Sequence, residues 1–600
     1  MGRIALGGYV GRILYVDLSN HRMKKEVLSE DFYKDWLGGY GLSSRITYNH
    51  IPPGTNSLDP ANLLGLTTGV LTGTLVPYSG SFTATGKSPL TGTWGDSRGG
   101  GRFGPELKRA GFDAIFVHGR SVKPVYLWIS EGEVEIRDAK GIWRKDTVET
   151  DKMIKEEHND NRIQIACIGP SGEKMSRISC IITDKGRAAG RSGLGAIMGS
   201  KKLKAVAVRG TDNITVEDIE TLKILRREFN RAVKEDKEFK YYTTYGTTGE
   251  TDAAIISGDS PVKNWAGIGV RDFSTGTEKM SDEDTVKFVV RKYACEGCPT
   301  PCGAWVRIEK GSYATETHKP EYETLAAFGS MCLNDDLESI TYATSICNRY
   351  GIDTISAGAT IAFAMECYEK GVLTKEETDD IELIWGNAEA IVEMTERIAK
   401  RKGFGATLSD GVKIAAERIG KGSEKFAMHV GGQEVPMHDP KLLTDPYTAK
   451  LGLIYTVDAT PARHTQGIGE HHAVMALGIC SFIGWMGSAA GGRDTLPNFI
   501  NAVTGWGVER RDLLEISNRI ATMRQVFNVR EGFRPSDFKL PDRILGKPPM
   551  KDGPLAGVTL DLEKERKKYF RSMQWGYRTG RPSRKRLIEL GLEDLTKDIY

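Results

Sequence analysis

The stretch TVEDIETLKILRREFNRAVKEDKEFKYY, residues 215–242, decides the fold class because the chain changes character there. It begins with a threonine, carries Glu217 and Asp218 in its first turn, and then repeats apolar residues at helical spacing. Before it the sequence consists mostly of short runs rich in Val, Ile and Tyr, and after it mostly of helical patterns. We therefore expect an α+β protein in which strands come first and helices follow.

Residues 1–210 are predicted to form a mainly antiparallel β domain with two helical pieces, near residues 31–36 and 147–158. Glycine clusters in this part, in runs such as DSRGGGRFG (96–104) and GRAAGRSG (186–193). Such runs indicate tight turns or a close approach of backbone to another group. The predicted strands are GRILYVDL (11–18), FDAIFVHG (112–119), PVYLWIS (124–130), GEVEIRDA (132–139), IQIACIG (163–169) and KAVAVRG (204–210).

The rest of the chain is predicted to form two mainly helical domains, residues 211–430 and 431–600. A loop-rich segment runs from Gly432 to about residue 485. Further helices are expected at 281–293, 338–350, 355–371, 375–402, 406–419, 496–503, 511–528 and 562–573.

Composition excludes several classes of protein. The net charge of +3 over 600 residues gives no support for a nucleic-acid or membrane surface. No uninterrupted apolar run reaches the roughly 18 residues of a transmembrane helix, and the N-terminus has no apolar core of signal-peptide type. We expect a cytoplasmic protein.

Three cysteines, Cys295, Cys298 and Cys302, fall within the loop CEGCPTPCG, residues 295–303. A zinc site normally shows two paired Cys or His motifs, and no second pair is present here. Three clustered cysteines plus a remote one favour a four-thiolate iron–sulfur cluster, with zinc as the alternative. Cys480, in the glycine-containing turn LGICSFIGW, is the best remote ligand.

The remaining cysteines are expected to be small buried apolar residues, because nine cysteines is an odd number and indicates no disulfide framework. They are Cys167, Cys180, Cys332, Cys347 and Cys367.

Motifs throughout the chain resemble the tungsten-containing aldehyde ferredoxin oxidoreductases. They include GGGRFGPELKRAGFDAIFVHG, DKGRAAGRSGLGAIMGSKKLKAVAV, CEGCPTPCG, PEYETLAAFGSMCLNDDLESI and RQVFNVREGF. The resemblance implies a β domain that forms the base for a tungsten or molybdenum bis-pterin cofactor, covered by the two helical domains. It also implies a [4Fe–4S] cluster that passes electrons to ferredoxin or a ferredoxin-like iron–sulfur subunit, and oxidation of aldehydes to carboxylic acids.

The resemblance assigns site residues. Cys480, which ends MALGIC, matches the family's fourth cluster ligand, and Asp353 ends a companion motif, NRYGID. The glycine-rich loops would bind the pterin phosphates and a magnesium ion between them. The implied cofactor-binding residues are Arg98, Gly99, Gly100, Arg102, Arg187, Ala188, Gly190, Asn348, Gly351, Asp353, Gly478 and Ile479.

The chain departs from the family's pattern at four positions in or near these motifs. Asn348 and Met475 stand where the family has pterin-binding aspartates, Ser81 stands where it often has an arginine, and Arg98 where it has an asparagine. A guanidinium at Arg98 or Arg102 is our hypothesis for replacing the lost charge.

The resemblance also implies the catalytic pair. Glu323, in PEYE, matches the family's proposed general base, and His464, in TPARHTQG, matches the histidine that can hydrogen-bond the aldehyde oxygen or a metal oxo group. His471 and His472 are expected near the substrate entrance, and His438 matches a turn near the pterins. The region SITYATSICN offers Tyr342 and no histidine, so no iron site between subunits is expected.

Two alternatives stay open. One is a tungsten subunit like those that reduce benzoyl-CoA, and the other is an electron-transfer subunit that binds a cluster without pterin chemistry. The sequence also does not decide whether the metal is tungsten or molybdenum, which aldehyde is the substrate, or in which direction the reaction runs. It likewise leaves open whether the chain forms a homodimer or a heteromeric complex.

Overall fold

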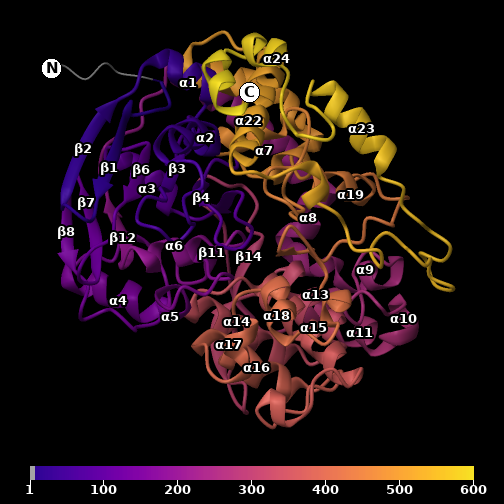
Figure 1. The fold of residues 1–600 in the computed structure, drawn as a ribbon. Helices are drawn as coiled ribbons and strands as arrows, with labels where there is room; N and C mark the ends of the chain where they lie inside the picture. Colours follow the sequence, from indigo (N-terminus) through magenta and orange to yellow (C-terminus); the bar gives the residue numbers. More distant parts are fainter. Residues whose placement is uncertain (1–6) are drawn as a thin grey trace.

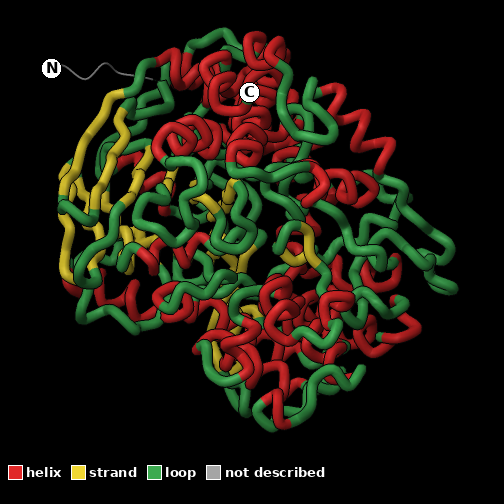
Figure 2. The backbone as a smooth tube through the Cα atoms, in the orientation of Figure 1, coloured by secondary structure: helices red, strands yellow, loops and turns green. Residues whose placement is uncertain are grey.

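The computed structural model describes residues 7–600 and separates strands from helices along the chain. Most strands gather at one side of the molecule, in the indigo and purple N-terminal part, and most helices lie in the rest, among many loops (Figures 1 and 2). This arrangement confirms the predicted α+β class. The domain boundaries near residues 210 and 430 remain predictions.

Two six-stranded sheets form the N-terminal part. In each sheet one neighbouring pair is parallel, β1 with β6 and β12 with β7, and the other pairs are antiparallel. The first sheet has the order β2 (Arg22–Val27), β1 (Arg12–Asp17), β6 (Ala114–His118), β3 (Leu64–Thr68), β4 (Phe82–Lys87) and β5 (Trp94–Gly99). The second has the order β11 (Arg187–Ala189), β10 (Ile181–Thr183), β9 (Gln164–Cys167), β12 (Leu203–Arg209), β7 (Val125–Ser130) and β8 (Glu133–Asp138).

Alternating apolar side chains pack the two sheets against each other. Leu14 and Val16 of β1 share one buried core with Leu127 of β7 and Val206 of β12. Ile13 of β1 belongs to a second core, which the first sheet shares with C-terminal helices. Successive residues of a strand point to opposite faces, so β1 is buried on both sides.

Helices are the main regular structure of the chain after residue 210. Those in the N-terminal part are α1 (Glu30–Trp36), α2 (Gly39–His50), α3 (Phe103–Arg109), α4 (Thr147–Glu157), α5 (Pro170–Glu173) and α6 (Leu194–Ser200). The others are α7 (Ile219–Glu235), α8 (Lys237–Thr244), α9 (Thr251–Ser257), α10 (Gly269–Asp272), α11 (Ser274–Lys279), α12 (Asp282–Val286), α13 (Tyr322–Phe328), α14 (Leu337–Tyr350), α15 (Thr354–Glu369), α16 (Ala388–Lys400), α17 (Phe404–Leu408), α18 (Val412–Ile419), α19 (Thr448–Val457), α20 (His471–Ala476), α21 (Leu496–Thr504), α22 (Arg510–Arg530), α23 (Glu563–Ser572), α24 (Arg584–Glu589) and α25 (Thr596–Ile599). None of the helices formed by residues 7–600 is long and apolar enough to span a bilayer.

The predicted helix at 281–293 is wrong in its second half. After the short α12 the chain forms β13 (Val289–Tyr293), which pairs antiparallel with β14 (Gly303–Ile308). The neighbouring valines at 289 and 290 favour a strand. A third strand, β15 (Thr315–His318), completes this small sheet, and the cysteine loop joins β13 to β14.

Two other predicted helices are shorter than expected. In 375–402 the regular helix begins only at Ala388, where the side chain of Asn387 caps it. The stretch 406–419 is two helices, α17 and α18, because Gly411 breaks it with φ of +88°. The loop-rich segment before residue 485 contains two helices, α19 and α20. Three helices of the N-terminal part, α2, α3 and α6, were not predicted, because their sequences are rich in glycine.

Candidate active site

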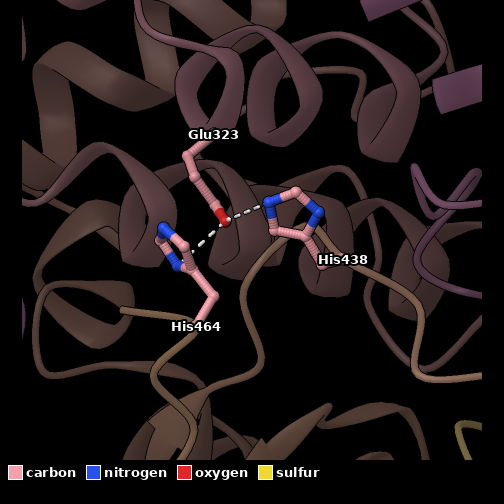
Figure 3. Close-up of side chains that lie close together, drawn as sticks. All are labelled: Glu323, His438 and His464. Atoms are coloured by element: carbon pink, nitrogen blue, oxygen red, sulfur yellow. Dashed lines mark ion pairs between the residues drawn. The ribbon is translucent and has the colours of Figure 1, made fainter. Parts of the chain in front are cut away.

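Glu323, His438 and His464 come from separate segments and meet in one cavity of about 920 Å³ (Figure 3). Glu323 lies in the first turn of α13, whereas the two histidines lie in loops on either side of α19. Nδ1 of His464 is 3.0 Å from Oε1 of Glu323, and Nε2 of His438 is 3.6 Å from the same oxygen. The two residues of the predicted pair are therefore in contact, and His438 is a third member that the sequence did not assign to catalysis.

His438 lies between two carboxylates. Its Nδ1 is 2.7 Å from Oδ2 of Asp259, and its Nε2 faces Glu323. Burial lowers the pKa of His438, but Asp259 and then Glu323 outweigh burial and raise it to about 9. His438 is thus an imidazolium at neutral pH.

The pKa values of the other two members, Glu323 and His464, shift in opposite directions. Burial raises the pKa of Glu323, and the charge on His438 opposes part of that rise. Burial, and then the positive charge on His438, lower the pKa of His464 well below its usual range. The site therefore combines a carboxyl group that takes up a proton more readily than usual with a neutral imidazole.

Hydrogen bonds to other residues hold the predicted catalytic pair through atoms other than the two that face each other. Oε2 of Glu323 accepts from the backbone N–H of Met437 at 2.9 Å, and the Tyr447 hydroxyl donates to the carbonyl of His464 at 2.8 Å. Oε1 of Glu323 and Nδ1 of His464 are buried and make no well-formed hydrogen bond within residues 7–600. One ligand atom from each of Glu323, His438 and His464 lies within 4.8 Å of the others, a spacing that also suits a divalent ion.

A buried charge network holds the segment that carries His464. Nη1 of Arg463 is 2.7 Å from Oδ1 of Asp96 in β5, and Nη2 of Arg524 in α22 is 2.8 Å from Oδ2. Although burial opposes it, the two guanidinium groups lower the pKa of Asp96 to about 2. Gln466 also donates to Asp96, at 2.8 Å. Sequence reasoning missed this anchor because a single aspartate within a strand has no signature of its own.

The four predicted cluster cysteines come together. Burial, and then the thiols of Cys295, Cys302 and Cys480, raise the pKa of Cys298 well above its usual range. The backbone N–H of Cys480 donates to Tyr78 at 2.9 Å, which ties the turn after α20 to the N-terminal part.

The close approach of the cysteine loop requires one glycine of the glycine-rich loop 96–104. A Cβ at Gly100 would lie 2.7 Å from Sγ of Cys295, so the cysteine loop can approach only where no side chain is present. Cys480 also lines the 920 Å³ cavity, so one predicted cluster ligand and the predicted catalytic pair share that cavity.

Arginines near both glycine-rich loops have buried nitrogen atoms that donate no hydrogen bond. Within the described part of the chain, these atoms are Nε of Arg98, Nη2 of Arg187, and Nε and Nη1 of Arg191. Nε of Arg191 does lie 3.5 Å from Oδ2 of Asp353. Buried guanidinium donors of this kind fit an anionic group such as a phosphate. Arg102 differs, since its side chain is exposed and lines a surface hollow beside Cys295.

The other predicted cofactor positions lie around these arginines. Gly190 accepts from the Ser97 hydroxyl and lies beside Asp353, while Ala188 is exposed on β11. Gly99 ends β5 and lies against the ring of Phe82.

The two related motifs adopt the same turn. Gly351 and Gly478 have φ of +72° and +82°, which only glycine adopts without strain. Asn348 uses its amide to donate to Thr317 at 3.3 Å, and Ile479 accepts from Arg98 through its carbonyl. Both turns are therefore formed despite the departures at Asn348 and Met475.

Two sequence-based expectations about other residues have clear outcomes. All five scattered cysteines are buried, as predicted. His471 is among the residues that line the cavity, whereas His472 is buried and contacts the Tyr40 hydroxyl at 2.9 Å. A place for His471 at the substrate entrance remains a prediction.

Known protein families and curated proteins match almost the whole chain. The family described as "Aldehyde ferredoxin oxidoreductase, N-terminal domain" matches residues 13–210, and "Aldehyde ferredoxin oxidoreductase, domains 2 & 3" matches residues 224–472 and 469–592. A tungsten-containing aldehyde ferredoxin oxidoreductase of Thermococcus kodakarensis is 35% identical over 98% of this chain and 99% of its own length. The WOR-like subunit of an aliphatic sulfonate oxidoreductase of Pyrococcus furiosus is 30% identical over 98% of each chain.

A solved structure shares the fold. The active-site complex BamBC of benzoyl coenzyme A reductase, determined with 1,5-dienoyl-CoA, superposes with a TM-score of 0.83 at 24% identity, covering 99% of this chain and 98% of that one. The chain belongs to the tungsten-containing aldehyde ferredoxin oxidoreductase family.

Proposed function

We propose that this chain is a tungsten or molybdenum bis-pterin oxidoreductase that oxidises aldehydes to carboxylic acids. Electrons would leave through a [4Fe–4S] cluster to ferredoxin or to a partner iron–sulfur subunit. The contact between Glu323 and His464, in a cavity that Cys480 also lines, is the observation that carries the proposal.

The residues present fit the cofactors that the family implies. The unused guanidinium donors of Arg98, Arg187 and Arg191 are suited to pterin phosphates, with magnesium as their counter-ion. The four thiols of Cys295, Cys298, Cys302 and Cys480 would ligate the cluster. When bound, the metal–pterin group supplies the two-electron redox chemistry, and the cluster supplies the path by which the electrons leave.

The protein's own groups handle protons and orientation. RCHO + H₂O gives RCOOH + 2e⁻ + 2H⁺, so one group must take a proton from the adding water. Glu323, with its raised pKa, is suited to accept it near neutral pH. His464, kept neutral, donates a hydrogen bond to the carbonyl oxygen, where negative charge develops.

His438 acts on Glu323 and not on the aldehyde. Its positive charge, fixed by Asp259, keeps Oε1 of Glu323 oriented and stabilises the carboxylate before proton uptake. It is therefore a positioning residue in the proposed reaction.

Elemental analysis followed by an aldehyde panel tests the proposal. Anaerobically purified protein should contain about one W or Mo and about four Fe per chain, and should reduce a viologen dye with simple aldehydes. Iron without W or Mo would favour the electron-transfer alternative. Zinc alone would mean that the cysteine loop holds a structural metal, and turnover of benzoyl-CoA without aldehyde activity would favour the reductase alternative.

A further inference from the structure

Two adjoining surface hollows, of about 640 and 460 Å³, lie on the outer side of the cysteine loop. They share Arg102, Asn161, Gln164 and Ala294 in their walls, and Cys295 lines the larger one. One predicted cluster ligand is therefore reachable from outside, away from the 920 Å³ cavity.

Positive charge is concentrated on these walls, whereas the whole chain carries only +3. The acidic wall residues are Glu106, Asp184 and Glu296. The basic wall residues are Arg102, Arg109, Lys155, Arg162, Lys185, Arg209, Arg291 and Lys292.

Ion pairs neutralise only part of this surface. Arg109 pairs with Glu296, and Arg209 pairs with Glu106. Two aspartates just outside the walls also form ion pairs: Asp160 with Arg162 and Arg209, and Asp151 with Lys155 and Lys185. Arg291 and Lys292 of β13 are exposed and form no ion pair with any residue of the described chain. Lys292 uses its ammonium group only to donate to the carbonyl of Thr243, at 2.9 Å.

We propose that this basic surface docks an acidic iron–sulfur protein that takes electrons from the cluster at Cys295. The inference rests on the proposed function, because it requires the four thiols to hold a cluster. Opposite charge steers encounter and sets orientation, and redox partners commonly use small, weak interfaces. In each encounter the chain's cluster loses one electron and the partner's cluster gains one, so two encounters remove the two electrons from one aldehyde.

The double variant Arg291→Glu/Lys292→Glu tests the docking surface, and Lys564→Glu/Lys568→Glu on α23 makes the same charge change elsewhere. Aldehyde oxidation by the holoenzyme is followed with an acidic two-[4Fe–4S] ferredoxin and, separately, with methyl viologen. At low salt we expect the β13 variant to raise the KM for ferredoxin by about tenfold or more. The rate with the dye should stay the same, and the α23 variant should behave as wild type.

Salt provides a second readout. The difference between wild type and the β13 variant should shrink between 0.02 M and 0.5 M salt, because screening weakens steering. An unchanged KM for ferredoxin, or an equal rise in the α23 variant, would overturn the docking surface while leaving aldehyde oxidation in place. If wild type oxidises no aldehyde, calorimetric titration with the same ferredoxin decides the question: salt-sensitive binding that the β13 variant loses supports the surface, and equal binding overturns it.

Discussion

The guanidinium of Arg98 donates a hydrogen bond to the thioether sulfur of Met475. A second nitrogen of Arg98 donates to the carbonyl of Ile479, just before Cys480. Two positions at which this chain departs from its family's pattern therefore contact each other. Arg98 brings a buried positive charge to the segment that carries the fourth cluster cysteine, even though Met475 contributes no charge.

We predict that Arg98→Ala lowers cofactor loading. Without the guanidinium, the turn at Gly478 loses a donor and the buried site loses a cation. Tungsten or molybdenum and iron per chain should fall to less than about half of wild type, whereas Arg98→Lys should retain more of both. Full loading of the alanine variant would mean that Arg98 has no part in holding either cofactor.

Glu323→Gln should abolish most turnover while the metal content stays normal. A positioned general base contributes about 10²–10⁴-fold, so we expect kcat to fall by about that factor. Glu321→Gln is the matched control, since Glu321 lines the same cavity but its carboxylate accepts from the Thr247 hydroxyl. Comparable losses in both variants would count against a specific role for Glu323.

His438→Gln should change the pH profile of kcat/KM. The charge on His438 lowers the pKa of Glu323, so its removal should raise that pKa and move the acid limb of the profile to higher pH. A basic limb near pH 9, where His438 loses its proton, should disappear. His429→Gln replaces another half-buried histidine, with a pKa of about 4, and should leave both limbs in place.

The same histidine predicts a pH-dependent stability. Its pKa is raised from 6.5 to about 9 on folding, so its stabilising effect is complete below pH 6.5 and is lost as pH rises through 9. The effect is on the order of 3 kcal/mol at most. Thermal melts should show wild type above His438→Gln by several degrees at pH 6, with a smaller difference at pH 10. An equal difference at both values would mean that packing, and not charge, explains the effect.

The parts of the site that sequence could predict are those with local signatures. Three cysteines in one loop indicate a cluster, and the two related motifs share a glycine, at 351 and 478, where the chain has a positive φ. His438 and Asp259 could not be paired from sequence, because 179 residues separate them and each lies in a loop, so only the tertiary fold brings them together. Likewise, β13 was mistaken for helix because its identity depends on pairing with β14, which lies beyond the cysteine loop.

Cys480→Ser should remove the cluster although it lies 178 residues after Cys302. A serine oxygen is a poor substitute for a thiolate in an iron–sulfur site, so iron per chain should fall from about four toward zero. The brown visible absorption and the electron paramagnetic resonance signal of the reduced protein should be lost with it. Cys367→Ala is the control, because Cys367 is fully buried in a helix and should leave the iron content unchanged. Retention of about four Fe by the Cys480 variant would show that another residue supplies the fourth ligand.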